Sequence, residues 1–292
     1  MPIRTLPTWS RLIRFLASDG HTYLGEPIDP ERDVGLAFAA GEIISAHVID
    51  AIVPWDGKAT RTGEVKTVFK LLSPVSAEMC GAIRATGLSY KDHAEEMHLP
   101  LPPVPVLFFK PSTTLADPSE VIPVPKVAQN DELDYEVELA IVIGRDAKNV
   151  KENEALEYVL GYTCANDLTA RKHQETSSQW AYAKGFDKFC PLGPCLVSSR
   201  SLPDPHVVSL QTRLNGKLMQ DGTAKKMIFP LAKVISYLSQ GTLLKAGTVI
   251  ITGTPPGIGN GRNPKVWLED RDEVQCYISH GLGTLVNTIR YE

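Results

Sequence analysis

Short hydrophobic runs that end at turn signals recur along the chain, and longer segments with helical spacing are few. Two such runs lie early in the sequence, at 11–16 and 41–52. Each is followed by an Asp-Gly pair, at 19–20 and at 56–57. Asp-Gly pairs between apolar runs are typical of β-hairpins. The pattern predicts a small N-terminal β domain over residues 1–75 and a larger domain over residues 76–292.

The larger domain repeats the strand pattern more often. Its apolar runs predict strands at 105–109, 135–144, 161–164, 207–214, 217–220, 247–252, 273–278 and 283–291. The pair Asn215-Gly216 predicts a type I′ turn inside a hairpin. Helical spacing is found at 152–160, at 168–174 and at 227–240, with Pro230 in the first turn of the last segment. Many strands with few helices predict an α+β fold that is mostly β, a mixed β-roll with peripheral helices.

The composition narrows the class of protein. The 292 residues are 43% hydrophobic and 22% charged, which is enough for a sizeable core. The net charge is −4 and no basic run is present, so nothing indicates nucleic-acid binding. No stretch approaches the roughly 20 apolar residues that a membrane helix needs. We therefore expect neither a nucleic acid nor a membrane as a partner.

Cysteine usage and the first residues bear on the compartment. The five cysteines are odd in number and form no Cys-x-x-Cys pair, so neither a disulfide framework nor a structural zinc site is predicted. Residues 1–18 contain three arginines and no acidic residue, which weakly resembles a mitochondrial presequence. A first β-strand at 11–16 is the alternative, and we favour it. The expected location is cytoplasmic, with a mitochondrial location as the alternative.

Two glutamates in one predicted strand are the first candidates for chemistry. Successive side chains of a strand point to opposite faces, so Glu136 and Glu138 share a face, roughly 6.5 Å apart at the base. Apolar side chains on the opposite face would enter a core. Two converging carboxylates repel each other unless a cation lies between them, and hard oxygen ligands suit Mg²⁺ or Mn²⁺. The alternative is a solvated polar strand face.

Asp167 follows the apolar run at 159–162 and precedes a predicted helical turn. An Asp in this place is commonly a helix N-cap. It becomes a metal-ligand candidate only as a third oxygen ligand beside the two glutamates. Both interpretations stay open from the residues alone.

His93 and Glu96 stand three residues apart. If the segment is helical, the two side chains meet. A carboxylate beside an imidazole orients the ring and raises its basicity, which gives a general base for a water molecule. The alternative is a surface helix with ordinary charges.

A lysine and a turn complete the candidates. Lys184 has the aromatic neighbours Trp180, Tyr182 and Phe186, and a lysine in such surroundings is placed to neutralise an acidic cluster. A surface lysine is the alternative. The segment 252–257 contains a tight turn that would present a hydroxyl and backbone N–H groups to a ligand, although it lacks phosphate-loop spacing. A purely structural turn is the alternative.

The order of these motifs resembles a known family. Residues 87–96, Gly-Leu-Ser-Tyr-Lys-Asp-His-Ala-Glu-Glu, are similar to the Gly-x-Asn-Tyr-x-x-His-x-x-Glu motif of the fumarylacetoacetate hydrolase superfamily. Further matching segments follow in the family's order, at 107–112, 135–139, 166–167, 169–174, 183–186 and 252–255. The match extends from about residue 82 to the C-terminus. The N-terminal unit resembles the small β domain of many members.

The resemblance implies roles for individual residues. It implies a site for Mg²⁺ or Mn²⁺, with Ca²⁺ as a substitute, whose ligands are Glu136, Glu138 and Asp167. It implies that His93 and Glu96 form a water-activating dyad on a segment that in relatives often closes over the substrate as a lid. It also implies that Lys184 lies beside the metal site. It implies contacts with the substrate or its developing oxyanion from Arg171, Gln174 and Thr254.

One position departs from the family motif. Ser89 stands where the motif usually has Asn. Serine still donates one hydrogen bond but reaches less far. We expect the packing of the lid to adapt and the chemistry to be retained.

The resemblance also implies a reaction class. We expect a homodimeric, metal-dependent hydrolase that cleaves a C–C bond in a small 2,4-diketo acid, such as an acylpyruvate or fumarylacetoacetate. The alternatives are an oxaloacetate-type decarboxylase, a 2-oxo acid tautomerase or isomerase, and a non-catalytic binding protein that retains the fold. The His93–Glu96 pair favours hydrolysis or decarboxylation over isomerisation, without separating these two. Residues 97–102 form an apolar lid segment that would accept a substrate larger than pyruvate derivatives.

Overall fold

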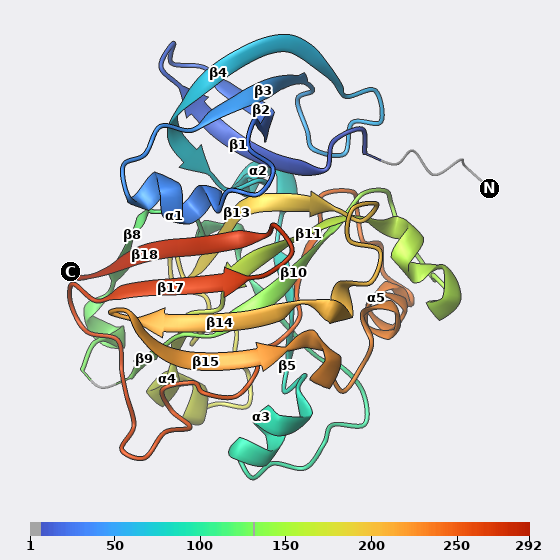
Figure 1. Cartoon of the computed structure of the whole chain (residues 1–292). Coiled ribbons are helices and arrows are strands. Elements are labelled where there is room, and N and C mark those ends of the chain that lie inside the picture. Colours follow the sequence, from blue (N-terminus) through green and yellow to red (C-terminus); the bar gives the residue numbers. More distant parts are fainter. Residues whose placement is uncertain (1–6, 131) are drawn as a thin grey trace.

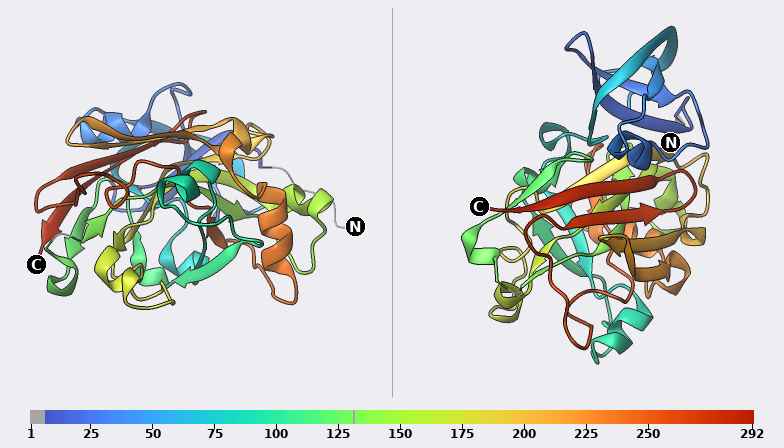
Figure 2. Two further views of the ribbon diagram at one scale, coloured as in Figure 1. Left: turned by 90° about the horizontal axis from the view of Figure 1, so that it is seen from below. Right: turned by 60° about the vertical axis from the view of Figure 1, so that its left-hand side comes forward.

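The computed structural model describes residues 7–130 and 132–292. Strands dominate, and the described helices are short. The first sheet has the strand order β2 (Thr22–Pro27), β3 (Ser45–Asp50), β4 (Thr60–Leu72), β1 (Arg11–Ala17), β13 (Cys190–Ser198), β11 (Val159–Asn166), β10 (Val137–Ile143), β16 (Val249–Ile251), β5 (Ile83–Gly87) and β6 (Val106–Lys110), with β7 (Leu115–Ala116) paired to β13. The second sheet has the order β15 (Lys217–Thr223), β14 (Ser209–Leu214), β17 (Glu273–Ile278), β18 (Gly283–Tyr291) and β8 (Val121–Val124). In Figure 2 the second sheet covers one side of the first, and the helices lie at the periphery. The prediction of a mostly β, mixed β-roll with peripheral helices is confirmed.

The N-terminal strands form a twisted antiparallel sheet at one end of the molecule, drawn in blue in Figure 1. Its elements are β1 Arg11–Ala17, β2 Thr22–Pro27, α1 Val34–Ala39, β3 Ser45–Asp50 and β4 Thr60–Leu72. The interpretation of residues 11–16 as a strand is confirmed. Ile13, Phe15 and Leu71 are fully buried in a separate small core. Asp33 caps α1, because its carboxylate accepts hydrogen bonds from two N–H groups of the first turn.

The N-terminal sheet continues into the rest of the chain. Strand β1 pairs antiparallel with β13, Cys190–Ser198, so that Arg11 lies opposite Val197. The backbone ladder therefore crosses from one unit to the other. The domain division at residues 75 and 76 stays a prediction.

The part of the first sheet that extends from β11 to the edge strand β6 holds the elements that carry the site. Their bounds are β5 Ile83–Gly87, β6 Val106–Lys110, β10 Val137–Ile143, β11 Val159–Asn166 and β16 Val249–Ile251. Strand β10 is antiparallel to β11 and β16, and β5 is parallel to β16. Every residue of β10 and β11 is buried, because sheet and helices cover both faces.

The second sheet consists of β8 Val121–Val124, β14 Ser209–Leu214, β15 Lys217–Thr223, β17 Glu273–Ile278 and β18 Gly283–Tyr291. Asn215 and Gly216 both have positive φ, 49° and 80°, between paired strands β14 and β15. The predicted type I′ hairpin is therefore confirmed. The inner faces of the two sheets meet in the main hydrophobic core.

Short elements fill the connections. They are α2 Ala77–Cys80, α3 Lys91–Glu96, η1 Ser112–Thr114, β7 Leu115–Ala116, η2 Lys126–Ala128, β9 Leu133–Asp134, η3 Glu152–Tyr158, β12 Thr169–Ala170, α4 Arg171–Glu175, η4 Pro205–Val207, η5 Ala224–Lys226 and α5 Leu231–Ser239. The helix predicted at 152–160 is present as a 3₁₀ helix over Glu152–Tyr158, and it ends there because Val159 already pairs with Ile143 in the sheet. The helix predicted at 227–240 begins only at Leu231, because Pro230 occupies its N-cap with an extended backbone.

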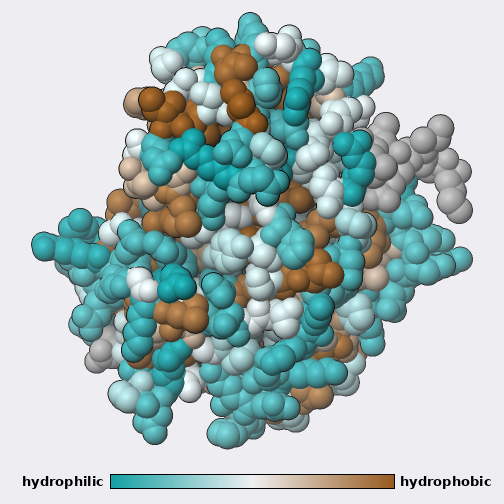
Figure 3. Space-filling view, viewed as in Figure 1, coloured by the Kyte–Doolittle hydropathy of each residue, from teal (hydrophilic) through white to brown (hydrophobic). Residues whose placement is uncertain are grey.

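The side of the molecule drawn in Figure 3 mixes hydrophobic and hydrophilic residues. Among the residues that the structure describes, no helix is both long and apolar enough to cross a membrane. In the view of Figure 3 the hydrophobic areas are small and separated by hydrophilic residues. The cytoplasmic location and the homodimer stay predictions.

Candidate functional site

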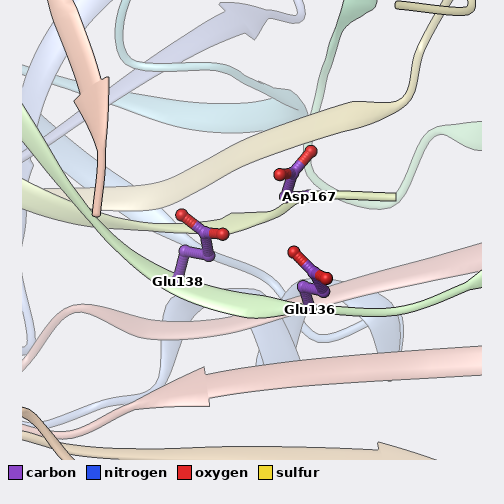
Figure 4. Close-up of side chains that lie close together, drawn as sticks. All are labelled: Glu136, Glu138 and Asp167. Carbon is purple, nitrogen blue, oxygen red and sulfur yellow. The ribbon is translucent and has the colours of Figure 1, made fainter. Parts of the chain in front are cut away.

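Three carboxylates converge beside strand β10. Tyr135, Val137 and Leu139 enter the hydrophobic core, and the alternation of the strand directs Glu136 and Glu138 to the opposite side. Asp167 directly follows β11, and its N–H donates to the carbonyl of Glu136 at 2.9 Å. Oxygen atoms of the three carboxylates lie within 4.8 Å of one another, and all three residues are buried. Figure 4 shows the three groups facing one another.

Two buried lysines compensate these charges. Lys184 Nζ lies 2.9 Å from Glu136 Oε2 and 2.7 Å from Asp167 Oδ2, so it lies between the two carboxylates. Lys110 Nζ donates to the other oxygen of Asp167 and to the carbonyl of Phe189. Lys110 stands at the end of β6 and was not a sequence candidate, although it lies inside the matched segment 107–112.

Arg171, at the start of α4, joins the cluster from another side. Its Nη2 donates to Glu136 Oε1 at 2.6 Å, its Nε to Asp134 Oδ2 at 2.9 Å, and its Nη1 to Gln174 Oε1 at 2.9 Å. Asp134 also accepts hydrogen bonds from the N–H groups of Gly259 and Asn260, at 2.7 and 3.0 Å. Sequence reasoning missed Asp134, which fixes both Arg171 and the loop after β16.

The charges of the cluster are unequal. Burial acts to raise the pKa of Glu136, but Lys184 and Arg171 outweigh it and lower the pKa to about 2. Burial, with Asp167 and Glu136 nearby, raises the pKa of Glu138 well above its usual value. Among the described residues no cation lies within ion-pair distance of Glu138, which accepts a hydrogen bond from the N–H of Gly253 at 2.6 Å.

Around this site, in the part of the chain that the structure describes, the buried carboxylates outnumber the buried cations by one. Lys110, Lys184 and Arg171 stand against four buried carboxylates, Asp134, Glu136, Glu138 and Asp167. The unmatched negative charge and the three hard oxygen donors fit a divalent ion such as Mg²⁺ or Mn²⁺.

Helix α3 brings a histidine and a glutamate together. His93 Nδ1 lies 3.0 Å from Glu96 Oε2, and Glu96 Oε1 accepts the N–H of Gly257 at 2.8 Å. A Cβ atom at Gly261 would lie 2.7 Å from Glu96 Cδ, so the loop approaches this carboxylate closely. The hydrogen bond to Gly257 connects helix α3 to the loop that follows β16.

The hydroxyl of Thr254 is engaged within the protein. It donates to the carbonyl of Val137 at 2.9 Å and accepts from Gln220 Nε2 at 2.8 Å. Gln220 is completely buried, and its Oε1 accepts from the N–H of Val137 and from the hydroxyl of Thr212. The hydroxyl proton of Thr254 is therefore already donated to the backbone, and its contact with an oxyanion stays a prediction.

Ser89 finds local partners in place of the family's Asn. Its hydroxyl lies within hydrogen-bonding distance of the carbonyl and the hydroxyl of Thr86, at 3.2 and 3.1 Å. A Cβ atom at Gly253 would come within 2.6 Å of Ser89 Cβ, so the loop after β16 packs directly against this position. Helix α3 also forms an ion pair with a neighbouring segment, between Asp92 and Lys226 at 2.8 Å.

One cavity of about 440 Å³ collects these groups. Its polar lining contains all the predicted site residues except Glu96, namely His93, Glu136, Glu138, Asp167, Arg171, Gln174, Lys184 and Thr254. Its apolar lining consists of Leu88, Met97, Leu99, Val106, Phe108, Trp180 and Ile258. The cavity thus combines a charged cluster with an apolar wall, as small-molecule sites commonly do.

The chain is similar to known proteins over most of its length. The family model described as "Fumarylacetoacetate (FAA) hydrolase C-terminal" matches residues 82–290. A caffeoylpyruvate hydrolase of Neonothopanus nambi is 45% identical over 290 residues, covering 98% of this chain and 94% of that protein. The human mitochondrial oxaloacetate tautomerase FAHD2A is 41% identical over 205 residues, covering 70% of this chain and 64% of that protein.

A solved structure shares the fold over almost the whole length. The 2-hydroxyhepta-2,4-diene-1,7-dioate isomerase of Mycobacterium marinum is 32% identical, with a TM-score of 0.79, over 97% of this chain and 99% of that one. The relatives named here are enzymes with three different reactions. The chain belongs to the fumarylacetoacetate hydrolase family.

Proposed function

We propose that the chain is a Mg²⁺- or Mn²⁺-dependent hydrolase that cleaves a C–C bond in a 2,4-diketo acid of the acylpyruvate class. The observation that carries this proposal is a cavity lined by the buried carboxylate triad and by His93, whose Nδ1 lies 3.0 Å from Glu96 Oε2. The name of the relative from N. nambi, a caffeoylpyruvate hydrolase, supports the same substrate class.

The protein groups would divide the work as follows. Glu136, Glu138 and Asp167 would hold the ion, which supplies Lewis-acid polarisation of the substrate's carbonyl oxygens when it is bound. Lys184 holds Glu136 and Asp167 in place through its hydrogen bonds to both carboxylates. Arg171 is the cation placed to attract the carboxylate of the substrate, because it lines the cavity and remains charged.

The dyad would activate water. Glu96 accepts a hydrogen bond from the Nδ1–H group of His93, which leaves Nε2 as the basic nitrogen. Nε2 takes a proton from water, and the water oxygen bonds to the carbonyl carbon of the acyl group. The C–C bond between that carbon and the CH₂ group breaks, and its electron pair stays on the CH₂ carbon. The imidazolium of His93 returns the proton to this carbon, so the products are pyruvate and the carboxylic acid of the acyl group.

A tautomerase or decarboxylase would use the same cluster without an attacking water. The His93–Glu96 pair favours hydrolysis or decarboxylation over tautomerisation, and the name of the N. nambi relative favours hydrolysis among these two. The name of the human relative keeps oxaloacetate tautomerisation as the second candidate.

The test is steady-state turnover with Mg²⁺ or Mn²⁺, and with EDTA, on acetylpyruvate, fumarylacetoacetate and oxaloacetate. The products are identified in addition to the absorbance measurement. An absorbance change alone is not enough, because the enol and keto forms of a substrate differ in absorbance even when no bond is cleaved. Metal-dependent release of pyruvate from acetylpyruvate supports the proposal. Conversion of oxaloacetate enol to keto form without cleavage of any diketo acid overturns it in favour of a tautomerase. Absence of Mn²⁺ binding by calorimetry favours a non-catalytic binding protein.

A further inference from the structure

We propose that Trp180 and Phe108 form an aromatic wall that selects acylpyruvates whose acyl group is a flat aromatic or conjugated group. The inference rests on the proposed function and names its substrate class and a specificity-determining residue, Trp180. Both aromatic residues line the cavity that holds the carboxylate triad.

The wall is built by two rings and one glycine. The ring centroids of Phe108 and Trp180 are 5.6 Å apart, and the ring planes meet at 72°, an edge-to-face arrangement. A Cβ atom at Gly87 would lie 2.1 Å from Cζ3 of Trp180. The indole therefore lies directly on the end of β5, and the missing side chain at Gly87 makes the space that it occupies.

The wall adjoins the charged end of the cavity. The N–H of Lys184 donates to the carbonyl of Trp180 at 3.1 Å, so one turn of the chain carries both residues. The ammonium of Lys184 also lies 5.3 Å from the ring centroid of Phe108. A substrate whose 2-oxo acid is held at the triad would extend its acyl group along these rings.

The remaining apolar lining comes from other segments of the chain. Met97 and Leu99 follow helix α3, and Leu88 and Val106 come from the ends of neighbouring segments. Leu99 is 50% exposed, so a bound apolar group would cover surface that otherwise faces water. The volume of about 440 Å³ lies in the range of roughly 300–1,000 Å³ that suits drug-sized ligands. An acetyl group would leave most of the wall uncovered.

Flat groups suit this wall better than saturated ones. Aromatic ligands gain from contacts with protein rings, such as those of Phe108 and Trp180, beyond the area that they bury. A saturated ring of equal carbon number buries similar area without that gain. The comparison of benzoylpyruvate with cyclohexanecarbonylpyruvate therefore isolates the aromatic contribution.

The experiment measures kcat/KM of the full chain with Mn²⁺ for benzoylpyruvate, cyclohexanecarbonylpyruvate and acetylpyruvate. The wild type is expected to prefer benzoylpyruvate. In Trp180→Leu the ratio of kcat/KM for benzoylpyruvate over acetylpyruvate is expected to fall about tenfold, mostly through KM, and Trp180→Phe to retain much of it. Tyr182→Leu is the matched control, since Tyr182 is exposed in the same turn and lies outside the cavity lining.

The outcomes separate this inference from the proposed function. An unchanged ratio in Trp180→Leu, or a wild-type preference for the cyclohexane compound, overturns the aromatic wall while hydrolysis stands. If no acylpyruvate is cleaved, the proposed function fails, and calorimetric binding of benzoylpyruvate to the Mn²⁺-loaded protein still tests the wall. Equal affinity of wild type and Trp180→Leu in that measurement overturns the inference.

Discussion

Glu96 holds His93 from one turn further along α3, with 3.0 Å between its Oε2 and the Nδ1 of the imidazole. Because the other carboxylate oxygen accepts the N–H of Gly257, the position of Glu96 depends on contact between helix α3 and the loop after β16. A displacement of α3 from this loop would break that hydrogen bond and loosen the pairing of Glu96 with His93.

His93→Ala is expected to lower kcat for a 2,4-diketo acid by about 100–10,000-fold, the usual contribution of a general base. Among the described residues, the imidazole of His93 hydrogen-bonds to Glu96 and not to the carboxylate triad, so the affinity for Mn²⁺ is expected to change little. Single-turnover kinetics and calorimetry with Mn²⁺ check the two halves. Loss of Mn²⁺ affinity would contradict the role as a base, because it would make His93 a ligand.

Glu138→Gln is expected to lower Mn²⁺ affinity at least about 100-fold, more than the loss of an outer-shell partner costs. The same change removes a buried carboxylate that has no ion-pair partner among the described residues. The protein in EDTA is therefore expected to melt at a higher temperature than the wild type. Titration calorimetry and thermal melts in EDTA test both effects, with the exposed Glu64→Gln as control. A variant with unchanged Mn²⁺ affinity would remove Glu138 from the ligand set.

Gly87→Ala is expected to displace the indole of Trp180, because the new Cβ would overlap the ring. The near-ultraviolet circular dichroism should change, and the preference for benzoylpyruvate over acetylpyruvate should fall in the same direction as in Trp180→Leu. Gly81→Ala is the control for backbone strain alone. Gly81 has a positive φ, but a Cβ atom there would meet nothing within 4 Å. An unchanged aromatic spectrum in Gly87→Ala would show that the indole does not depend on this glycine.

The sequence predicted the parts of the site that follow from local geometry. The period of a strand is enough to direct Glu136 and Glu138 to one face and Val137 to the other. The i, i+3 spacing is likewise enough to bring Glu96 to His93. Asp167 joins the two glutamates only because β11 pairs with β10, which no local pattern reveals, so its assignment needed the resemblance.

Three buried polar residues were missed for the same reason. Asp134, Lys110 and Gln220 find their partners across many residues of sequence, in Arg171, Asp167 and the loop after β16. Each stands at the end of an apolar run, where a polar residue is ordinarily exposed. The helix predicted at 152–160 ends two residues earlier, at Tyr158, because Val159 already pairs with β10.

Asp134→Asn is expected to destabilise the protein by about 3–5 kcal/mol, the usual cost of breaking a buried ion pair by removing one partner. Asp134 is completely buried and accepts from Arg171, Gly259 and Asn260, so the variant leaves the guanidinium with Glu136 as its remaining carboxylate. Urea unfolding of the metal-free chain measures the loss. Asp270→Asn, at the surface, is the control. A difference below about 1 kcal/mol would mean that the loop N–H groups, which an amide oxygen also satisfies, carry most of the stabilisation.

Asp19→Asn tests the N-terminal sheet through pH. The N–H of His21 and the hydroxyl of Tyr23, with help from Lys66, lower the pKa of Asp19 from 3.8 to about 2. A lowered folded pKa contributes stability above the unfolded pKa, and this contribution is lost as the pH falls from about 4 through about 2. The melting temperature of the variant is therefore expected to lie below that of the wild type at pH 7, with the difference disappearing near pH 2. A difference that stays constant over this range would mean that the carboxylate charge does not contribute, and that only the hydrogen-bond geometry of the turn matters.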